Sequence, residues 1–443
     1  MRIAVIGSGV AGNVAAWSLN ARHDVVLYEK RLRPGGHSAT VEVDYDGVHV
    51  TVDTGFIVFN ERNYPNFCAL MDHLDVPSER SNMSFAVSCD DGALEWSGNG
   101  LGAIFAQKRN IFSPKFLKML AEILRFNKQA RLDLASGALC GKSLGGYLST
   151  GRYARPFVDN YLAPMGAAIW STPSAHIMDF PAESFVRFLE NHRLLNVRPP
   201  EWQTITGGSK IYVEKLIEPL ARKPRGLRLG QPVVRLERDA DGVTVIDSSG
   251  ERDRFDEVVL ASHTDQTLDI LGDNATADER RILGAVGYRD NDVYLHRDAA
   301  LMPKRRSVWS SWNYLGSSAP EKQEQDVTVS YWMNKLQNID HAYPLFVSLN
   351  PSVAPRPELT FGRYTYAHPQ FNSAAIAAQL ELPALQGQNR TWFCGAWAGY
   401  GFHEDGARSG LDVAEQLGGY IPWRATHQMV PERGRFVGLE AAE

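Results

Sequence analysis

Apolar and polar residues near the start of the chain predict a strand, a turn, a helix and a second strand. Residues 2–6 form a short apolar run, the sequence GSGVAG occupies positions 7–12, and residues 13–19 show helical spacing. A second apolar run at 24–28 ends in Glu29. This is the order of elements in an α/β unit that binds a dinucleotide.

Each glycine of this turn has a separate expected role. Gly7 allows the chain to turn tightly, Gly9 allows the backbone to approach a pyrophosphate, and Gly12 allows the helix to pack close to the strand. Val10 and Ala11 lie at the start of the helix, whose positive end then faces the phosphates. The alternative is an ordinary glycine turn in another kind of α/β protein.

The residues after the second strand favour FAD over NAD. Glu29 is expected to accept hydrogen bonds from ribose hydroxyls and to disfavour a 2′-phosphate, and Lys30 follows it. Gly35 and Gly36 then form a second glycine pair, ahead of a hairpin with its turn at 46–47. A second close approach of the backbone suits a long cofactor that lies extended across the domain. NAD enzymes do not need it.

A second strand, glycine turn and helix lies far downstream. The apolar strand at 391–394 runs into a glycine-rich segment at 395–410, and a helix continues to Leu417. A helix N-terminus here would offer N–H groups and a positive dipole to the pyrimidine edge of a flavin, where negative charge develops on reduction. The alternative is a glycine-rich turn with no ligand.

Composition indicates an ordinary folded protein. The chain has 443 residues, 44% hydrophobic and 22% charged, which is long enough for two packed domains. Lys and Arg number 46 against 51 Asp and Glu, which gives no electrostatic reason to expect nucleic acid as a partner. Four scattered cysteines lack C-x-x-C spacing, so we expect buried free thiols and no metal site.

Localisation follows from two further features. The first strand begins at residue 2, which leaves no room for a signal peptide, and no apolar run reaches the ~20 residues of a transmembrane helix. We therefore expect a cytoplasmic protein, with contact at the inner face of the membrane left open. The sequence does not indicate an oligomeric state.

These motifs resemble the flavin-containing amine oxidoreductase superfamily, which includes monoamine oxidases, protoporphyrinogen oxidases, phytoene desaturases and FAD-dependent polyunsaturated fatty acid isomerases. The resemblance covers about the first sixty residues, 204–265 and 390–417. Within it, the loop at 206–209 is similar to the second glycine loop of the superfamily. The runs at 233–236, 241–245 and 256–261 are similar to the strands that return to its FAD domain. A bacterial, lipid-acting branch is the expected place of this chain.

The resemblance implies an α/β fold, with a Rossmann-type FAD-binding domain of the glutathione-reductase kind and an inserted α+β substrate domain. The expected FAD domain is discontinuous, at 1–80, 201–269 and 389–420. The expected substrate domain comprises 81–200 and 270–388, and 421–443 is a C-terminal tail.

The resemblance also implies the residues that contact FAD. Val234 is expected to meet the adenine through its backbone, and Ala261 to lie near the phosphates. The full expected set is Gly7, Gly9, Val10, Ala11, Gly12, Glu29, Lys30, Gly35, Gly36, His37, Ser38, Thr54, Gly55, Phe56, Val234, Ala261, Gly395, Ala396, Glu404, Asp405, Gly406 and Ala407.

Several departures from the superfamily pattern affect the expected chemistry. His37 stands where the superfamily usually has an arginine, and Ala396 where it often has an acid, so retention of FAD could be weaker. Cys394 lies inside a strand, away from the position of a flavin-linking cysteine, which implies non-covalent FAD. The run 287–296 contains no lysine, and His403 replaces one aromatic-cage tyrosine. An imidazole can move a proton at physiological pH, so simple amine oxidation is less favoured.

Two blocks of sequence are expected to build the substrate side. The first contains helices at 114–134, after the N-cap candidate Ser113, and at 181–192. The second contains a strand at 326–332. We expect most of its aromatic residues in the core and some around an apolar cavity, from the set Trp309, Trp312, Tyr314, Tyr331, Trp332, Tyr364, Tyr366 and Phe371.

The segment 108–131 is basic and amphipathic. It carries seven Lys and Arg residues against Glu122 alone, with apolar residues between them. One interpretation is peripheral contact with an anionic bilayer, and the other is a solvated helix with one face in the core.

Together these features predict an FAD-dependent oxidoreductase that acts on a hydrophobic, unsaturated lipid, with a fatty acyl chain as the leading candidate. Desaturation and double-bond isomerisation are both open, with hydride passing to or from flavin N5 and His403 as the first candidate for the accompanying proton. One alternative is an amine oxidase that produces peroxide. Another is a non-catalytic module that binds FAD or lipid.

Overall fold

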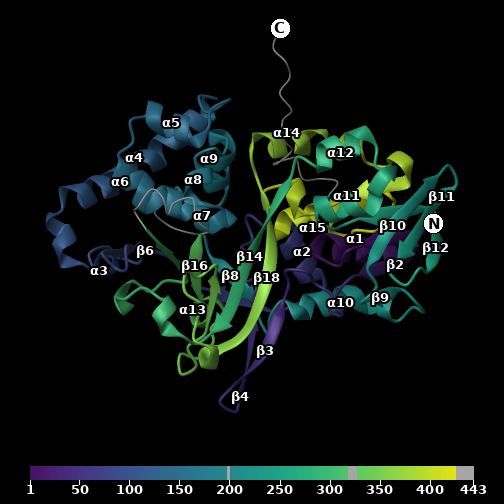
Figure 1. Ribbon diagram of the computed structural model, residues 1–443, viewed down its shortest axis with the longest axis horizontal. Coiled ribbons are helices and arrows are strands. Elements are labelled where there is room, and N and C mark those ends of the chain that lie inside the picture. The colour runs from purple at the N-terminus through teal and green to yellow at the C-terminus, as the bar shows by residue number, and fades with distance from the viewer. Residues whose placement is uncertain (197–199, 318–326, 426–443) are drawn as a thin grey trace, which may run out of the picture.

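The computed structural model describes residues 1–196, 200–317 and 327–425 (Figure 1). Its first sheet has five parallel strands in the order β19-β13-β1-β2-β9. Because the strands are parallel, their carboxyl ends meet at one edge of the sheet, where ligands of open α/β sheets bind. The strands are β1 (Arg2–Ile6), β2 (Asp24–Glu29), β9 (Leu227–Leu229), β13 (Glu257–Leu260) and β19 (Thr391–Phe393).

Alternate residues of β1 enter two separate cores, as the period of a strand requires. Ile3 and Val5 are buried with residues of α1, α10 and α15, whereas Ala4 and Ile6 are buried with residues of α11, α12, α14 and a small second sheet. The helices are α1 (Val10–Asn20), α10 (Lys210–Ala221), α11 (Thr264–Leu271), α12 (Ala277–Leu283), α14 (Ser373–Glu381) and α15 (His403–Gln416). The small sheet consists of β10 (Val233–Asp239), β11 (Gly242–Asp247) and β12 (Arg252–Phe255).

A seven-stranded sheet of order β18-β14-β17-β16-β15-β6-β7 forms the other half of the molecule. All neighbours are antiparallel except β15 and β6. Five of the eight aromatic residues singled out in the sequence are buried: Trp309, Tyr314, Trp332, Tyr366 and Phe371. The strands are β6 (Phe85–Cys89), β7 (Leu94–Ser97), β14 (Gly287–His296), β15 (Trp312–Gly316), β16 (Thr328–Trp332), β17 (Phe346–Leu349) and β18 (Thr360–Gln370).

Helices between β7 and β8 form a lobe beside this sheet, on the left in Figure 1. The longest is α4 (Pro114–Ala135), which begins where the sequence predicts because the Ser113 hydroxyl accepts from the Phe116 amide. The others are α3 (Leu101–Ile104), α5 (Leu144–Thr150), α6 (Arg155–Phe157), α7 (Ala163–Trp170), α8 (Ser174–Ile177) and α9 (Ala182–Asn191).

Shorter elements join the two halves. The hairpin of β3 and β4 has its turn at Asp46–Gly47, as the sequence predicts, and β5 pairs with β8. The elements are β3 (Thr40–Tyr45), β4 (Val48–Asp53), β5 (Ser78–Ser81), β8 (Trp202–Ile205), α2 (Pro65–His73), α13 (Met333–Leu336) and α16 (Pro422–Ala425).

The architecture confirms the predicted fold class, a Rossmann-type sheet with an additional α+β part. The strands β6 and β7, from the expected block 81–200, share a sheet with strands of 270–388. Helices α12 and α14, also inside 270–388, pack instead in the core with Ala4 and Leu260 of the five-stranded parallel sheet. The expected domain limits stay a prediction, and residues 426–443 of the expected tail lie outside the described residues. No helix in the described ranges has the length and apolar character needed to cross a bilayer.

Candidate functional site

The glycine turn after β1 has the shape that a bound phosphate needs. Gly7 has φ +105°, and a Cβ there would lie 2.9 Å from the carbonyl oxygen of Ala261. A Cβ at Gly9 would meet no atom within 4 Å, so the backbone is open at the N-terminus of α1. The first turn of α1 contains no acidic residue, and no side chain caps it. Its free N–H groups and positive dipole therefore fit an anionic group such as a pyrophosphate.

Glu29 lies buried at the carboxyl end of β2, as a ribose-binding acid should. One carboxylate oxygen accepts from the amide and hydroxyl of Ser8, at 3.0 and 2.6 Å, and the other accepts from the Arg31 amide at 2.9 Å. A carboxylate has about four acceptor sites, so capacity for a ribose hydroxyl remains. The exposed Lys30 side chain donates to Gln266 at 3.2 Å instead of turning towards the glycines.

The second glycine pair lies directly against the first turn. The Gly35 amide donates to the Ser8 carbonyl at 2.9 Å, and Gly36 has φ +58°. A Cβ at Gly36 would lie 3.0 Å from the Cα of Gly9, so a larger residue there would crowd the turn. Two backbone segments 27 positions apart thus meet at the edge where the phosphates are expected.

The adenine and phosphate candidates also lie near this edge. Val234 sits at a bulge where the pairing of β10 with β11 is interrupted, and half of its surface is exposed. The Gln231 amide donates to the Glu29 carbonyl at 3.0 Å, which holds the chain before Val234 beside the end of β2. The Ala261 amide donates to the Ile6 carbonyl at 2.8 Å, and this places Ala261 next to Gly7.

The C-terminal glycine segment meets the N-terminal one through close helix packing. A Cβ at Gly406 would lie 2.6 Å from Val10, and one at Gly410 would collide with the Ala11 carbonyl. Ala407, which lies between these two glycines in the sequence, is fully buried. The N-termini of α1 and α15 are therefore side by side, although almost 400 residues separate them.

The turn before α15 is fixed to the same sheet. The Gly395 amide donates to the Ser409 hydroxyl at 3.0 Å, and the Trp397 indole donates to the Ser262 carbonyl at 3.2 Å. Ala396 packs against Gly406, where a Cβ would lie 3.6 Å away. The segment 395–410 thus joins the edge that carries Ala261.

The carboxylates of Glu404 and Asp405 accept hydrogen bonds from backbone amides. Glu404 accepts from the amides of Asn66 and Phe67 at 3.1 and 2.9 Å and so caps α2. Burial raises the pKa of Glu404 to about 7. Asp405 accepts from the amides of Tyr400 and Phe402. If these residues contact FAD, backbone amides of the first turn of α15 are the groups suited to do so.

His403 lies in a buried aromatic environment. Its ring stacks on Phe56 at 3.6 Å, and Nε2 lies 2.9 Å from the Ser38 hydroxyl and 2.8 Å from the Tyr212 hydroxyl. Burial lowers the pKa of His403 to about 3, so the imidazole is neutral at pH 7. The structure therefore joins two candidates from the sequence, Ser38 and His403, and adds Tyr212, which the sequence did not single out.

Thr54 and Gly55 connect the hairpin of β3 and β4 to β18 and to the loop at 35–38. The Thr54 hydroxyl lies 2.7 Å from that of Tyr366 on β18, and the Phe56 amide donates to the His37 carbonyl at 2.9 Å. A Cβ at Gly55 would collide with that same carbonyl. The loop 35–38 and the chain after β4 are thus held in direct contact.

Three half-buried histidines gather beside this loop. The ring of His37 lies 5.4 Å from that of His368 and 6.3 Å from that of His263. The Nε2 atom of His37 is buried and has no hydrogen-bond partner. Tyr366 lies 5.0 Å from His37, and Tyr288 stacks on His263 at 4.4 Å.

Burial keeps these imidazoles neutral. It lowers the pKa of His37 well below its usual range and that of His368 to about 4, and it also lowers the pKa of His263. Arg31 and His403 act in the same direction on His37. Around His263, Lys30 and Arg31 lower its pKa, while Asp265 and Asp290 oppose them.

The sequence did not single out His263 or His368. His263 could have been found from its position just after a parallel strand, at the edge where ligands bind. His368 could not, because only the pairing of β18 with β14 brings it to this place.

These observations fit FAD. The open backbone at Gly9, the uncompensated N-terminus of α1 and the unpartnered nitrogen of His37 all suit a negatively charged pyrophosphate, and Glu29 suits a ribose. Within the described part of the chain, no group of three His, Cys, Asp or Glu residues is arranged to hold a metal ion.

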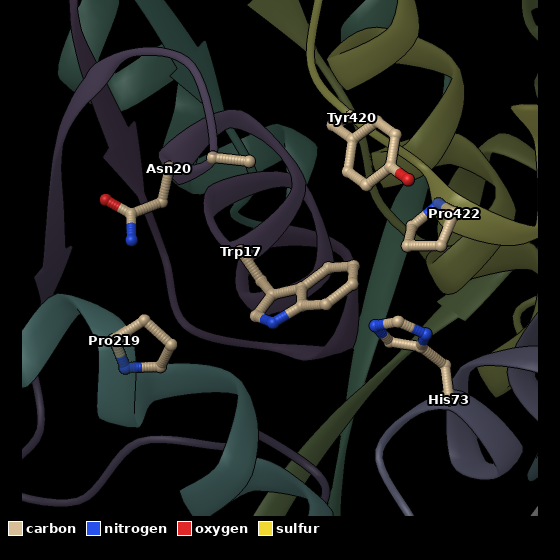
Figure 2. Close-up of a pocket in the computed structure, with 7 residues that line it drawn as sticks. Trp17, Asn20, His73, Pro219, Tyr420 and Pro422 are labelled. Carbon is tan, nitrogen blue, oxygen red and sulfur yellow. The ribbon is translucent and has the colours of Figure 1, made fainter.

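A cavity of about 270 Å³ lies elsewhere, at the C-terminal end of α1 (Figure 2). The rings of Trp17 and His73, which both line it, meet edge to face with their centroids 5.4 Å apart, and none of the residues expected to contact FAD lines it. The glycine turn is at the opposite end of the same helix, so this cavity does not belong to the nucleotide site. Its lining consists of Trp17, Asn20, Ala21, His73, Pro219, Tyr420 and Pro422.

Several solved structures share this fold. A putrescine oxidase has a TM-score of 0.68 at 14% identity, with 94% of this chain and 99% of that chain covered. A fatty acid isomerase from P. acnes that produces CLA has a TM-score of 0.65 at 15% identity, covering 94% and 98%. Cyclohexylamine oxidase from Brevibacterium oxydans has a TM-score of 0.64 at 14% identity, covering 94% and 99%. At these identities the likeness establishes the fold alone.

Comparison with curated proteins found no match. A family model described as flavin containing amine oxidoreductase matches residues 10–268, which is 259 of the 443 residues. This range begins within the glycine turn, at Val10, and includes Gly12, Glu29 and the second glycine pair. It also includes His37 and His263 but not His368. The chain belongs to the flavin-containing amine oxidoreductase family and is an FAD-dependent oxidoreductase.

Proposed function

We propose that this enzyme acts on a hydrophobic, unsaturated lipid and that the reacting part is a fatty acyl chain. The reaction is a desaturation or a shift of a double bond, at the cytoplasmic face of a membrane. When bound, non-covalent FAD supplies a site for hydride at its N5 atom. The protein's own residues bind the cofactor, enclose the apolar substrate and handle the accompanying proton.

The observation that carries this proposal is the group of imidazole and phenol rings where β14 and β18 meet the nucleotide-binding half. β14 contains no lysine, and the imidazoles of His37, His263 and His368 are half-buried, with pKa values that desolvation lowers. Tyr288 and Tyr366 are the aromatic neighbours of these rings. These rings offer no negative charge to an ammonium group, which loses much hydration energy on burial, so they suit an acyl chain better.

The similar structures support two candidate substrates. One is a fatty acid isomerase, and two are oxidases of putrescine and cyclohexylamine. Their identities to this chain are almost equal, so the choice depends on the site and not on the likeness. An amine oxidase is the second candidate, favoured by the family that the chain belongs to.

We propose His403 as the group that handles the proton. Two observations support this role. His403 lies at the N-terminus of α15, and its ring is hydrogen-bonded to the hydroxyls of Ser38 and Tyr212, which can relay a proton. The set of FAD contacts expected from the sequence is part of the proposal, as is the division into an FAD domain and a substrate domain.

The test is anaerobic mixing of the FAD-loaded enzyme with unsaturated fatty acids or phospholipids, with putrescine and cyclohexylamine as matched amines. We expect a lipid to bleach the flavin, or to leave it oxidised while mass spectrometry detects a moved double bond. Bleaching by an amine, followed by peroxide release in air, would establish the second candidate and overturn the first.

A further inference from the structure

Exposed apolar side chains are concentrated in one short stretch of the chain. Among the residues that the structure describes, thirteen large hydrophobic side chains are exposed, and six of them lie within residues 101–132. The side chain of Phe112 is 86% exposed and that of Leu101 is 76% exposed. Almost every other apolar side chain of the described residues is less exposed than these two. A contiguous exposed apolar surface usually marks a binding face. The six are Leu101, Ile111, Phe112, Leu117, Leu124 and Leu132.

The same stretch carries strong positive charge. Residues 101–132 contain seven Lys and Arg and one acid, a net charge of +6, whereas the whole chain has −5. The acid, Glu122, is paired with Arg125 at 2.6 Å. The exposed lysines are Lys108, Lys115, Lys118 and Lys128. The rest of the protein therefore carries a net negative charge, and this stretch stands out against it.

Helix geometry places the apolar and basic groups of α4 together. Leu117, Leu124 and Lys128 are 7 and 11 residues apart, close to two and three turns of about 3.6 residues, so they share one face. Phe116, Met119 and Phe126 of the same helix are buried in the core. One face of α4 is thus packed and the other is presented outward.

The outward face continues beyond α4. The short helical turn η1 (Lys108–Phe112) contacts α4 and carries Ile111 and Phe112, and α3 carries Leu101. In Figure 1, α3 and α4 lie at the outer end of the helical lobe, away from the nucleotide-binding sheet. We call the exposed residues of α3, η1 and α4 the basic apolar face.

We propose that the basic apolar face docks on an anionic lipid bilayer, with Phe112 and Leu101 in the acyl boundary and the lysines at the headgroups. Exposed apolar side chains interspersed with lysines are the pattern of an interfacial helix. A second copy of the chain fits less well, because pairing this face with itself would bring two net charges of +6 together. The inference deepens the proposed function, on which it rests, by naming the surface that meets the lipid.

Sedimentation with vesicles tests the docking. The FAD-loaded protein is mixed with vesicles of phosphatidylcholine alone or with added phosphatidylglycerol, both with saturated chains. We expect binding to the anionic vesicles, weakened by salt. Equal or absent binding to both would overturn the proposal, as would a salt-stable dimer whose interface covers Leu124.

Matched variants identify the face. Leu124 and Leu380 are both 63% exposed and both lie on helices, α4 and α14. Leu124→Ser should weaken vesicle partitioning about tenfold, whereas Leu380→Ser should leave it unchanged. Neutralising Lys118 and Lys128 together, as K118Q and K128Q, should weaken it about thirtyfold. Equal effects of the two leucine variants would overturn the assignment.

The docking surface and the lipid substrate can be tested independently of each other. The saturated vesicles contain no double bond, so sedimentation reports docking alone. Turnover of a detergent-solubilised lipid reports the chemistry without a bilayer. Loss of docking with retained turnover would overturn the docking surface only, and the converse would overturn the lipid substrate only.

Discussion

His37, His263 and His368 reach one place from a loop, a strand end and an edge strand. Burial disfavours their charged forms, and a pyrophosphate beside them would favour those forms. The two influences oppose each other. Binding of FAD should therefore be coupled to uptake of a proton by this cluster.

Because the imidazoles are neutral without the cofactor, the FAD-bound state holds more protons than the free state. Affinity for FAD should then fall as pH rises from about 5 to 8, by up to about tenfold per pH unit for one proton. Equilibrium dialysis at several pH values measures it. His37→Arg should tighten binding and flatten the slope, and His49→Gln, at an exposed position, should change neither. An unchanged Kd at pH 5.5 and 8 would contradict the coupling.

The proposed role of His403 in proton transfer can be tested by measuring cofactor binding and flavin reduction separately. His403→Ala should retain FAD and slow flavin reduction at least about 100-fold, since a positioned proton carrier contributes that much. Tyr212→Phe removes one of the two hydroxyls at Nε2 and should have a smaller effect. Stopped-flow absorbance gives the rates. A His403→Ala enzyme with full rate would assign the residue a packing role.

Among the elements, the contact of α1 with α15 depends on two glycines. A Cβ at Gly410 would collide with the backbone of α1, and one at Gly406 would press on Val10. No rotamer change relieves a clash with backbone, so the two helices would have to separate.

Gly410→Ala should therefore lower the free energy of unfolding by about 1–3 kcal/mol and weaken FAD binding. Urea unfolding, with FAD titration, measures both. Gly102→Ala is the control, because a Cβ there meets no atom within 4 Å and the residue lies in helix α3. If both variants unfold at the same urea concentration, the packing argument fails.

Elements with local signals could be predicted from the sequence. Ser113 and Pro114 mark the start of α4, and the turn at 46–47 marks the hairpin, because capping and turn geometry depend on adjacent residues. The cap of α2 could not be predicted, since Glu404 is 338 positions from Asn66. The histidine cluster could not either, because it depends on strand pairing between distant segments.

At the scale of the whole molecule, both ends of the chain contribute to one site. Gly9 and His403 each begin a helix at the edge where β1, β2 and β13 end. The glycine motifs alone predicted this meeting, since each is a strand, turn and helix of the same kind. A single cofactor that contacts both would hold the two ends together.

Hydrogen exchange should reveal that link. Adding FAD should slow amide exchange in 7–12, 35–38 and 403–407 together, because ordered contacts at one segment stabilise the others. The helix α4 provides the internal control and should not change. Protection limited to the N-terminal segments would contradict a shared site.

The sheet of β19, β13, β1, β2 and β9 also constrains biosynthesis. Its first strand begins at residue 2 and its last at residue 391. At a translation rate of about 5–20 residues per second, roughly 20 to 80 seconds pass between them on the ribosome. In the last part of that interval, after β13 has been made and before β19 follows, β13 lacks its outer neighbour, and the nascent polypeptide presents an unpaired edge that chaperones would need to shield.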